Sequence, residues 1–264
     1  MTSFASPGPL TSLAGVDARV LADLPSDPVS LCRVASRLVI QPHDASVAGV
    51  PDTRLGEKQI RPASRIVAAL LAEQDSPLAA GREPAARVVG TCRHFAVLST
   101  ALLRHRGIPA RARCGFATYF QSGQGLDHWV TEFLEGGRWV RIDSEALPLA
   151  VLERPEDLRP GEFLTGGEAW AAHRAGEIDA AKFGVWGTEN FGPGEIRGNA
   201  IRDLASLNKL ETLPWDEWGR MDASYKGETG ADYDELMDRI AAVDDPEALY
   251  DEVPELRVPE SLIR

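Results

Sequence analysis

The pair Gly136-Gly137 lies between two stretches that alternate apolar and polar residues, and it constrains the fold of this 264-residue chain more than any other feature. Two consecutive glycines suit a two-residue hairpin turn, because both central positions need positive φ angles. The pattern predicts antiparallel strands over residues 127–135 and 138–145. A turn of this length also fixes the register of the two strands.

Counting outward from the turn gives the predicted cross-strand partners. The pairs are Glu135 with Arg138, Glu132 with Arg141, Val130 with Asp143 and His128 with Glu145. Because successive side chains point to opposite faces, one face carries Trp129, Phe133, Val140 and Ile142. The other face carries His128, Glu132, Arg141, Asp143 and Glu145. A slip of one residue would exchange the two faces.

A helix is predicted to begin at Cys92, directly after Thr91, which is a suitable N-cap residue. Apolar residues at helical spacing continue to about Arg106, and Gly107 ends the helix. A further strand is predicted over Ala110–Phe120, where small and apolar residues alternate with arginines.

These elements place groups suited to nucleophilic catalysis near one another. A thiol reacts as its thiolate, and a helix N-terminus stabilises the thiolate at a position such as that of Cys92. A neutral imidazole must accept the thiol proton, which His128 could do, and a carboxylate should orient the imidazole. Asp143 is the diagonal neighbour of His128 and Glu145 the direct one, so the hairpin geometry leaves both carboxylates as candidates.

The sequence GTCRHFAVLSTALLRHRGIPARARCGFATYF, followed by DHWVTEFLEGGRWVRIDSE, resembles the core of the transglutaminase-like superfamily. In that family a Cys opens a helix, a His begins a later strand, and an Asp ends the next one. The resemblance implies that Cys92 is the nucleophile, His128 the base and Asp143 the orienting acid, in preference to Glu145. Ser144 departs from the family pattern, in which Pro is common after the Asp.

The resemblance also implies an α+β fold with a papain- and transglutaminase-like core, in which the Cys-bearing helix packs on an antiparallel sheet. We expect a single domain over residues 1–264, with its catalytic core at about 63–150. Helical segments are expected before this core, and an irregular extension over 160–264 after it. Within the extension, helices are predicted at Ile196–Leu210 and Tyr233–Val243, followed by a loosely packed tail.

The function that the resemblance implies is cysteine-dependent acyl transfer from an amide or activated acyl group to an amine, through an acyl-enzyme. An alternative is a peptidase or amidase that hydrolyses an amide with the same three residues. A third hypothesis, from another class, is a binding module without catalytic activity. Backbone N–H groups at the start of the Cys92 helix would stabilise the oxyanion. Upstream, in residues 74–91, the one side chain of a suitable type is that of Gln74.

The formal net charge of −12 and the isoelectric point of about 4.9 argue against nucleic-acid or anionic-membrane partners. The expected substrate is a small-molecule or peptide amide, and no metal or organic cofactor is implied. The acidic balance mildly favours cationic substrates such as amines. The oligomeric state is left open.

Three cysteines without C-x-x-C spacing indicate neither a disulfide framework nor a thiolate zinc site. Cys32 and Cys114 lie on apolar stripes and are predicted to be core residues. The chain shows neither a signal-peptide pattern nor a long apolar run, which leads to the expectation of a cytoplasmic protein.

Several polar and aromatic residues have a structural and a functional interpretation. Arg111 and Arg113 could line a site for an anionic group or could occupy an exposed strand face. His94 is predicted to point away from Cys92, with a surface or supporting role. Tryptophans 186, 215 and 218 could shape a substrate channel, although packing of the extension on the core is the simpler expectation.

Overall fold

The computed structural model describes residues 3–263 of the chain, which divide into two compact units. The N-terminal unit contains residues 3–112 and 130–157, and the C-terminal unit contains residues 113–129 and 158–263. The chain passes between the units along strands β3 (Ala110–Ala117) and β4 (Gly125–Glu135), each of which has residues in both. The single domain expected from the sequence stays a prediction.

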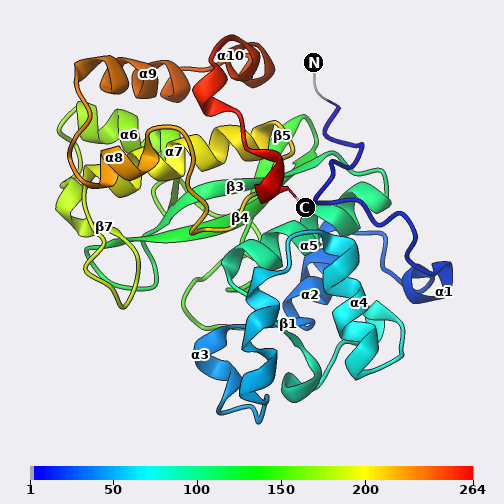
Figure 1. Ribbon diagram of the computed structural model, residues 1–264. Coiled ribbons are helices and arrows are strands. Elements are labelled where there is room, and N and C mark those ends of the chain that lie inside the picture. Colours follow the sequence, from blue (N-terminus) through cyan, green and yellow to red (C-terminus); the bar gives the residue numbers. More distant parts are fainter. Residues whose placement is uncertain (1–2, 264) are drawn as a thin grey trace. The chain divides into compact units, whose positions relative to one another are not determined.

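The N-terminal unit is mainly helical (Figure 1). Its elements before β3 are α1 (Ala18–Leu21), α2 (Pro28–Ser36), β1 (Val39–Ile40), α3 (Pro42–Ala45), a 3-10 segment (Asp52–Gln59), α4 (Ala63–Glu73), two short 3-10 turns (Leu78–Ala80 and Pro84–Ala86), β2 (Val88–Val89) and α5 (Cys92–His105). Residues 41–62 contain α3 and the 3-10 segment, in spite of three prolines and two glycines. The short strands β1 and β2 pair in parallel.

The core of the N-terminal unit lies between three helices and the hairpin. Leu31 of α2, Ile66 of α4 and Leu98 of α5 are fully buried there. Phe133 of β4 and Ile142 of β5 (Arg138–Ile142) belong to the same apolar cluster. Burying side chains of this size contributes about 1.5–3 kcal/mol each. This confirms the predicted packing of the Cys-bearing helix on the antiparallel hairpin.

The hairpin has the predicted turn and register. Gly136 and Gly137 have φ angles of 58° and 82°, as a two-residue turn of this kind requires. The cross-strand pairs run from Glu135 with Arg138 to Thr131 with Ile142. Strand β5 ends at Ile142, three residues earlier than the sequence predicted, because the chain turns at the next residue.

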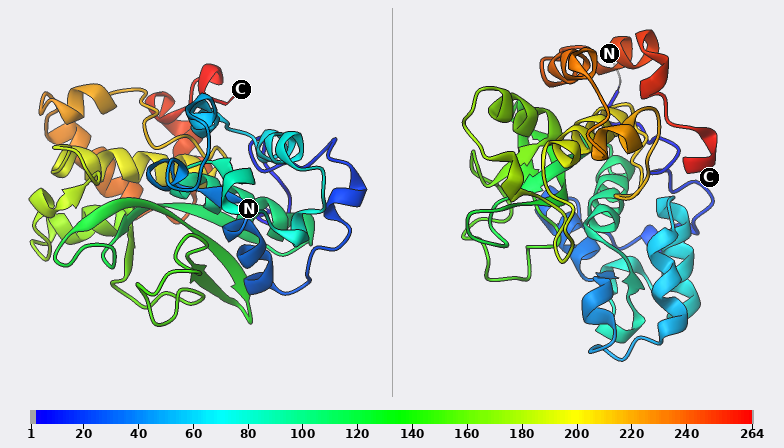
Figure 2. Two further views of the ribbon diagram at one scale, coloured as in Figure 1. Left: turned by 90° about the horizontal axis from the view of Figure 1, so that it is seen from below. Right: turned by 60° about the vertical axis from the view of Figure 1, so that its left-hand side comes forward.

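The C-terminal unit contains the other ends of β3 and β4 and a group of helices. Its further elements are β6 (Phe163–Thr165), α6 (Gly166–Arg174), a 3-10 turn (Ala180–Lys182), β7 (Phe183–Gly184), α7 (Pro193–Leu207), α8 (Met221–Tyr225), α9 (Ala231–Ala241), α10 (Pro246–Glu252) and two further 3-10 turns (Pro254–Leu256 and Glu260–Leu262). Strand β6 pairs antiparallel with β3, and β7 pairs in parallel with β4. Helix α7 packs against α6, α8, α9 and α10 (Figure 2).

This arrangement corrects two expectations for the C-terminal part of the chain. Residues 160–264 were expected to be irregular apart from two helices, which correspond to α7 and α9, but their described part forms five α-helices around a core that includes Trp170, Ile196 and Met237. The closing stretch was expected to be loosely packed, but Leu256 and Val258 are buried in that core. Apolar residues spaced among many Pro and Gly residues concealed the helical periodicity.

Within residues 3–263 no helix combines the length and the apolar character that crossing a bilayer requires.

Candidate active site

Cys92 is the first residue of α5, as predicted, and its side chain is 7% exposed. Thr91 precedes it in an extended N-cap conformation. At this position a cysteine lies at the N-terminal end of the helix, where the helix dipole favours negative charge. The local structure is therefore suited to a thiolate nucleophile.

His94 supports this helix start from inside the core. Its Nδ1 accepts a hydrogen bond of 3.1 Å from the Thr91 backbone N–H. It also packs so closely on Gly90 that a Cβ atom there would lie 2.6 Å from the imidazole. Burial lowers the pKa of His94 to about 3, with a smaller contribution from the charge of Arg93. His94 is thus a neutral, fully buried capping residue, which matches the supporting role of the two predicted and excludes the surface role.

Asp143 follows β5 directly and is 1% exposed. Its Oδ1 atom accepts hydrogen bonds from the backbone N–H groups of Glu145 (2.9 Å) and Ala146 (3.2 Å). Its own backbone N–H donates to the Pro155 carbonyl (2.9 Å). These contacts fix the orientation of the carboxylate at the end of the strand.

The two residues after Asp143 attach this turn to the segments around Cys92. Ser144 is hydrogen-bonded to Ser99 of α5, with 2.7 Å between their hydroxyl oxygens. Glu145 accepts a hydrogen bond of 2.8 Å from Nε2 of Gln41. Ser144 thus has a defined role at the position where the family commonly has Pro. Glu145, the other candidate acid, is engaged by Gln41.

Gln41 is a residue that the sequence did not single out. It follows β1, and the Ile40 carbonyl accepts a hydrogen bond from the N–H of Gly90, two residues before Cys92. Gln41 therefore lies beside the segment that leads into α5. Gln74, the earlier candidate, caps the C-terminal end of α4 and hydrogen-bonds Ser76. The sequence did not reveal Gln41, because its position depends on the pairing of β1 with β2, and neither strand is longer than two residues.

His128 lies on β4 in the C-terminal unit and is 3% exposed. The rings of Phe120 and Tyr119 meet its imidazole edge to face, at centroid distances of 5.1 and 6.2 Å. Aromatic neighbours in this geometry restrict rotation of the ring. Strand β4 continues two residues later, at Val130, into the unit that holds Cys92 and Asp143. The convergence of the three side chains stays a prediction.

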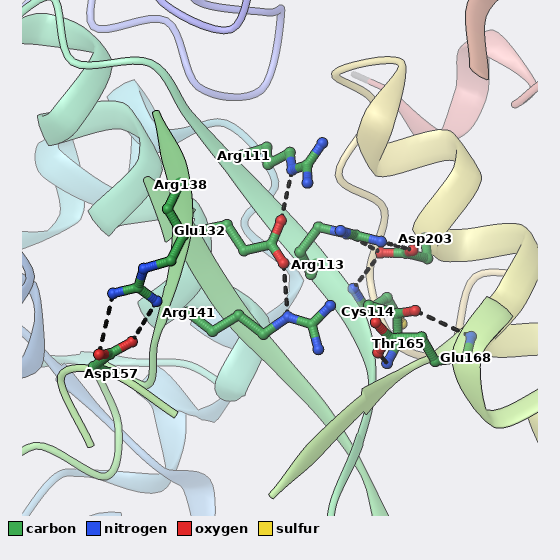
Figure 3. Close-up of polar contacts among 10 residues, drawn as sticks. All are labelled: Arg111, Arg113, Cys114, Glu132, Arg138, Arg141, Asp157, Thr165, Glu168 and Asp203. Carbon is green, nitrogen blue, oxygen red and sulfur yellow. Dashed lines mark hydrogen bonds and ion pairs between the residues drawn. The ribbon is translucent and has the colours of Figure 1, made fainter. Parts of the chain in front are cut away.

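Glu132 is the centre of a charged cluster on the hairpin (Figure 3). Its two carboxylate oxygens accept hydrogen bonds from Arg111 (2.6 Å) and Arg141 (2.7 Å). The pair with Arg141 confirms the predicted cross-strand ion pair. Arg111 also lies 4.1 Å from the centre of the Trp139 ring, which favours a cation. The guanidinium group of Arg111 is bound by Glu132 and is only partly exposed, so the residue does not lie on a fully exposed strand face.

Arg113 is likewise bound, inside the C-terminal unit. Its guanidinium group makes two hydrogen bonds to Asp203 of α7, of 2.9 and 2.7 Å (Figure 3). Asp203 also accepts the Cys114 backbone N–H. Arg113 is 9% exposed, so it does not occupy the exposed face that the sequence allowed. A bidentate pair of this kind fastens α7 to β3.

The other two cysteines are core residues, as predicted. Cys32 and Cys114 are both 0% exposed. Burial raises the pKa of the Cys32 thiol to about 12. The Cys114 thiol donates to the Asn199 side chain at 3.4 Å.

Comparison with known proteins matches residues 65–144 to the family model described as the transglutaminase-like superfamily. We call these residues the transglutaminase-like segment, because they are similar to that superfamily. The transglutaminase-like segment includes Cys92, His128 and Asp143, and it supports a cysteine-based enzymatic role. The match does not distinguish acyl transfer from hydrolysis.

Among solved structures, this chain matches a protein from Cytophaga hutchinsonii that is described, provisionally, as a cysteine protease. It is 19% identical, and the superposition has a TM-score of 0.35 over 55% of this chain. The chain spans only 41% of that protein. No curated protein matches the sequence.

Proposed function

We propose that the chain is a cysteine-dependent acyltransferase that moves an acyl group from an amide or activated acyl donor to an amine. In this proposal Cys92 is the nucleophile, His128 the general base and Asp143 the residue that orients the imidazole. The observation that carries the proposal is the position of Cys92 at the first residue of α5, inside the transglutaminase-like segment. The hydrogen bond between the hydroxyl groups of Ser99, on α5, and Ser144, next to Asp143, supports it.

The proposed reaction has two halves. The Cys92 thiol gives its proton to His128, and the sulfur attacks the carbonyl carbon of the donor. Collapse of the tetrahedral intermediate expels the leaving amine, which takes the proton from the imidazolium. The acceptor amine then attacks the thioester, loses its proton to His128 and releases the thiolate. Asp143 stabilises the imidazolium in each half.

The oxyanion of both tetrahedral intermediates needs hydrogen-bond donors. Backbone N–H groups in the first turn of a helix have no acceptor one turn earlier in the helix, so that of Cys92, the first residue of α5, is suited to this role. Gln41 supports the site as a positioning residue, because its amide holds Glu145 beside the turn that carries Asp143. Removing one oxyanion donor in other enzymes reduces kcat by about 100- to 1000-fold.

Water in place of the amine would turn the same reaction into hydrolysis. The products separate the two reactions, because transfer gives a new amide and hydrolysis gives a free acid. At a high concentration of a primary amine, we expect the new amide to be the main product. Free acid as the sole product at every amine concentration would replace the transferase by a peptidase or amidase.

The direct test is intact-mass detection of an acyl adduct after incubation with a panel of amides and thioesters. We expect an added mass equal to the acyl group in the wild type and none in Cys92→Ala. The matched control is Cys32→Ala, which should retain the adduct because Cys32 is a buried core residue. An adduct of equal yield in Cys92→Ala would show that Cys92 is not the nucleophile.

A binding module without catalytic activity would also form no acyl adduct. Thiol labelling identifies that case. In the native protein we expect iodoacetamide to label Cys92 at least about 10-fold faster than Cys32 or Cys114 at neutral pH. Burial keeps the Cys32 thiol protonated, since its pKa is about 12. Equal labelling rates for the three cysteines would favour the inactive module.

A further inference from the structure

The C-terminal unit contains a cavity of about 590 Å³ that the proposed reaction does not use. Its walls come from the loop after β7, from α7 and from residues 214–227. The two Trp- and Gly-rich stretches of the sequence, 184–195 and 213–219, both contribute to it. A volume of this size is typical of small-molecule binding sites.

The basic side chains of this cavity are already engaged by the protein. Their partners are Asp234 for Arg197 (2.7 Å), Asp222 for Lys226 (2.6 Å) and the Tyr225 hydroxyl for Arg202 (3.0 Å). Arg202 also donates to the Asn199 side chain and to the Asp216 carbonyl, both at 3.2 Å. An anionic ligand would have to compete with these acceptors for each cation.

The acidic side chains of the cavity are not matched in the same way. Among residues 3–263, no hydrogen bond or ion pair engages the carboxylates of Glu189, Glu195 and Glu217. Ser224 also lines the cavity; it is 3% exposed, and its hydroxyl has no hydrogen-bond partner in the described chain. The polar groups of the cavity that lack partners are therefore mainly hydrogen-bond acceptors. They suit a ligand that donates hydrogen bonds.

Glu195 is the least exposed of these three acidic residues. It lies in the first turn of α7, where the helix dipole favours a negative charge. The pKa of Glu195 is nevertheless raised to about 7, mainly by burial, with smaller raising contributions from Asp127 and Glu217 and an opposing one from Arg202. The ionised carboxylate is thus under-stabilised in the empty cavity, and a bound cation would stabilise it.

Aromatic rings complete the lining. Trp215 is 41% exposed at the cavity wall, although a tryptophan is usually largely buried, and Phe191 and Tyr225 lie on the same lining. The faces of such rings attract organic cations, with energies of about 0.5–2 kcal/mol. Carboxylates combined with aromatic faces are a common arrangement for binding ammonium and guanidinium groups.

We propose that this cavity binds an organic cation, a protonated amine or a guanidinium group, between Glu195 and the ring of Trp215. The site differs from the proposed catalytic one, because Asp127 lines the cavity while His128, the next residue of β4, leaves the strand on the opposite face. The proposal goes beyond the acyl-transfer function, since it needs neither Cys92 nor an acyl donor.

The proposed site makes binding depend on pH. The charged and titratable groups that face Glu195 are Arg202 of α7, Asp127 of β4, Glu217 and Tyr225 of α8. Below pH 7 the Glu195 carboxyl is largely protonated, so a cation must displace a proton in order to bind. We therefore expect affinity to rise about 10-fold between pH 6 and pH 8, and a proton to be released on binding near pH 7.

The test is isothermal titration calorimetry of the full chain with agmatine, with spermidine and with an Nα-acetyl-lysine methylamide as a model of a protein side chain. We expect saturable binding at pH 8, with 1-pentanol as a neutral probe that does not bind. Comparing the free amines with the lysine derivative shows whether the cavity takes a small metabolite or a side chain. The Cys92→Ala variant should bind equally well, so the outcome does not depend on the proposed acyl transfer.

Matched variants decide whether the cavity is the binding site. Glu195→Gln should weaken binding at pH 8 by about 10-fold or more and remove its pH dependence. Trp215→Leu should also weaken it, and this variant serves as the second test if Glu195→Gln does not fold. The control Glu235→Gln removes an exposed carboxylate from α9, outside the cavity, and should bind as the wild type does. The proposal is overturned by absence of binding at about 10 mM probe, by equal affinities of the Glu195 and Glu235 variants, or by tighter binding of pyrophosphate than of any cation.

Discussion

His94 takes no part in the proposed reaction, yet it fixes the segment from which the nucleophile projects. Its Nδ1 atom accepts the Thr91 N–H, and its ring fills the space beside Gly90. A side chain larger than glycine at residue 90 would displace this ring. One buried imidazole therefore holds the residues on both sides of the helix start, and its protonation should affect the stability of the whole unit.

The first prediction concerns the pH dependence that His94 imposes. Its pKa falls from 6.5 to about 3 on folding, mainly through burial. Between these values the unfolded chain binds one more proton than the folded chain, so stability decreases as the pH falls below 6.5. From pH 7 to pH 5 we expect this residue to cost about 2 kcal/mol. Urea unfolding at the two pH values measures the change.

The variant His94→Gln keeps an acceptor for the Thr91 N–H but does not titrate. Its loss of stability from pH 7 to pH 5 should be smaller than that of the wild type by about 2 kcal/mol. His43→Gln, at an exposed position, should retain the wild-type pH dependence. Equal pH dependence in wild type and His94→Gln would mean that the imidazole is protonated in the folded state.

At the scale of elements, the glycine turn between β4 and β5 also determines where Asp143 lies, at the far end of β5. The register set by the glycine turn extends to Thr131 opposite Ile142. The Thr131 hydroxyl donates to the Ala96 carbonyl of α5 at 3.2 Å, so the hairpin is attached to the helix of the nucleophile. A change of register would move Asp143 as well as the packed face.

The second prediction is that both turn glycines are required for their backbone conformation alone. A Cβ atom would meet no other atom within 4 Å at Gly136 or Gly137, yet both have positive φ angles. Gly136→Ala and Gly137→Ala should each reduce stability by about 1–2 kcal/mol. The control is Gly56→Ala, where a Cβ atom also meets nothing and φ is not positive. Thermal unfolding should show the control at or slightly above wild-type stability.

At the scale of the whole molecule, the transglutaminase-like segment is smaller than the compact unit that contains its nucleophile. The segment begins at residue 65, inside α4, whereas the core around α5 also requires Leu31, Cys32 and Leu38. Arg93 donates at 2.7 Å to the carbonyl of Arg61, which also lies outside the segment. Residues between 3 and 64 therefore contribute to the folded core.

The third prediction follows from this division. A fragment of residues 65–144 should not fold alone, because it lacks α2 and the other apolar residues before residue 65 that belong to the core around α5. Circular dichroism on heating should show a gradual change without a cooperative transition, whereas the full chain should unfold cooperatively. A sharp transition in the fragment would show that the matched segment is an autonomous domain.

The sequence alone determined the elements whose signals are local. The start of the helix at Cys92, the turn at Gly136 and the register of the hairpin depend on residues within a few positions of one another. The candidate residues Cys92, His128 and Asp143 came from the same stretch and from its resemblance to a family. The sequence also placed Cys32 and Cys114 in the core correctly.

Only the tertiary structure decided which distant residues meet. Gln41 reaches Glu145 across 104 positions, and Arg113 reaches Asp203 across 90. The helices after residue 160 and the cavity beside Glu195 likewise depend on packing between segments that show weak periodicity by themselves. A cap or a turn is stabilised by neighbours in the chain, but a long-range contact forms only when the surrounding core brings its two ends together.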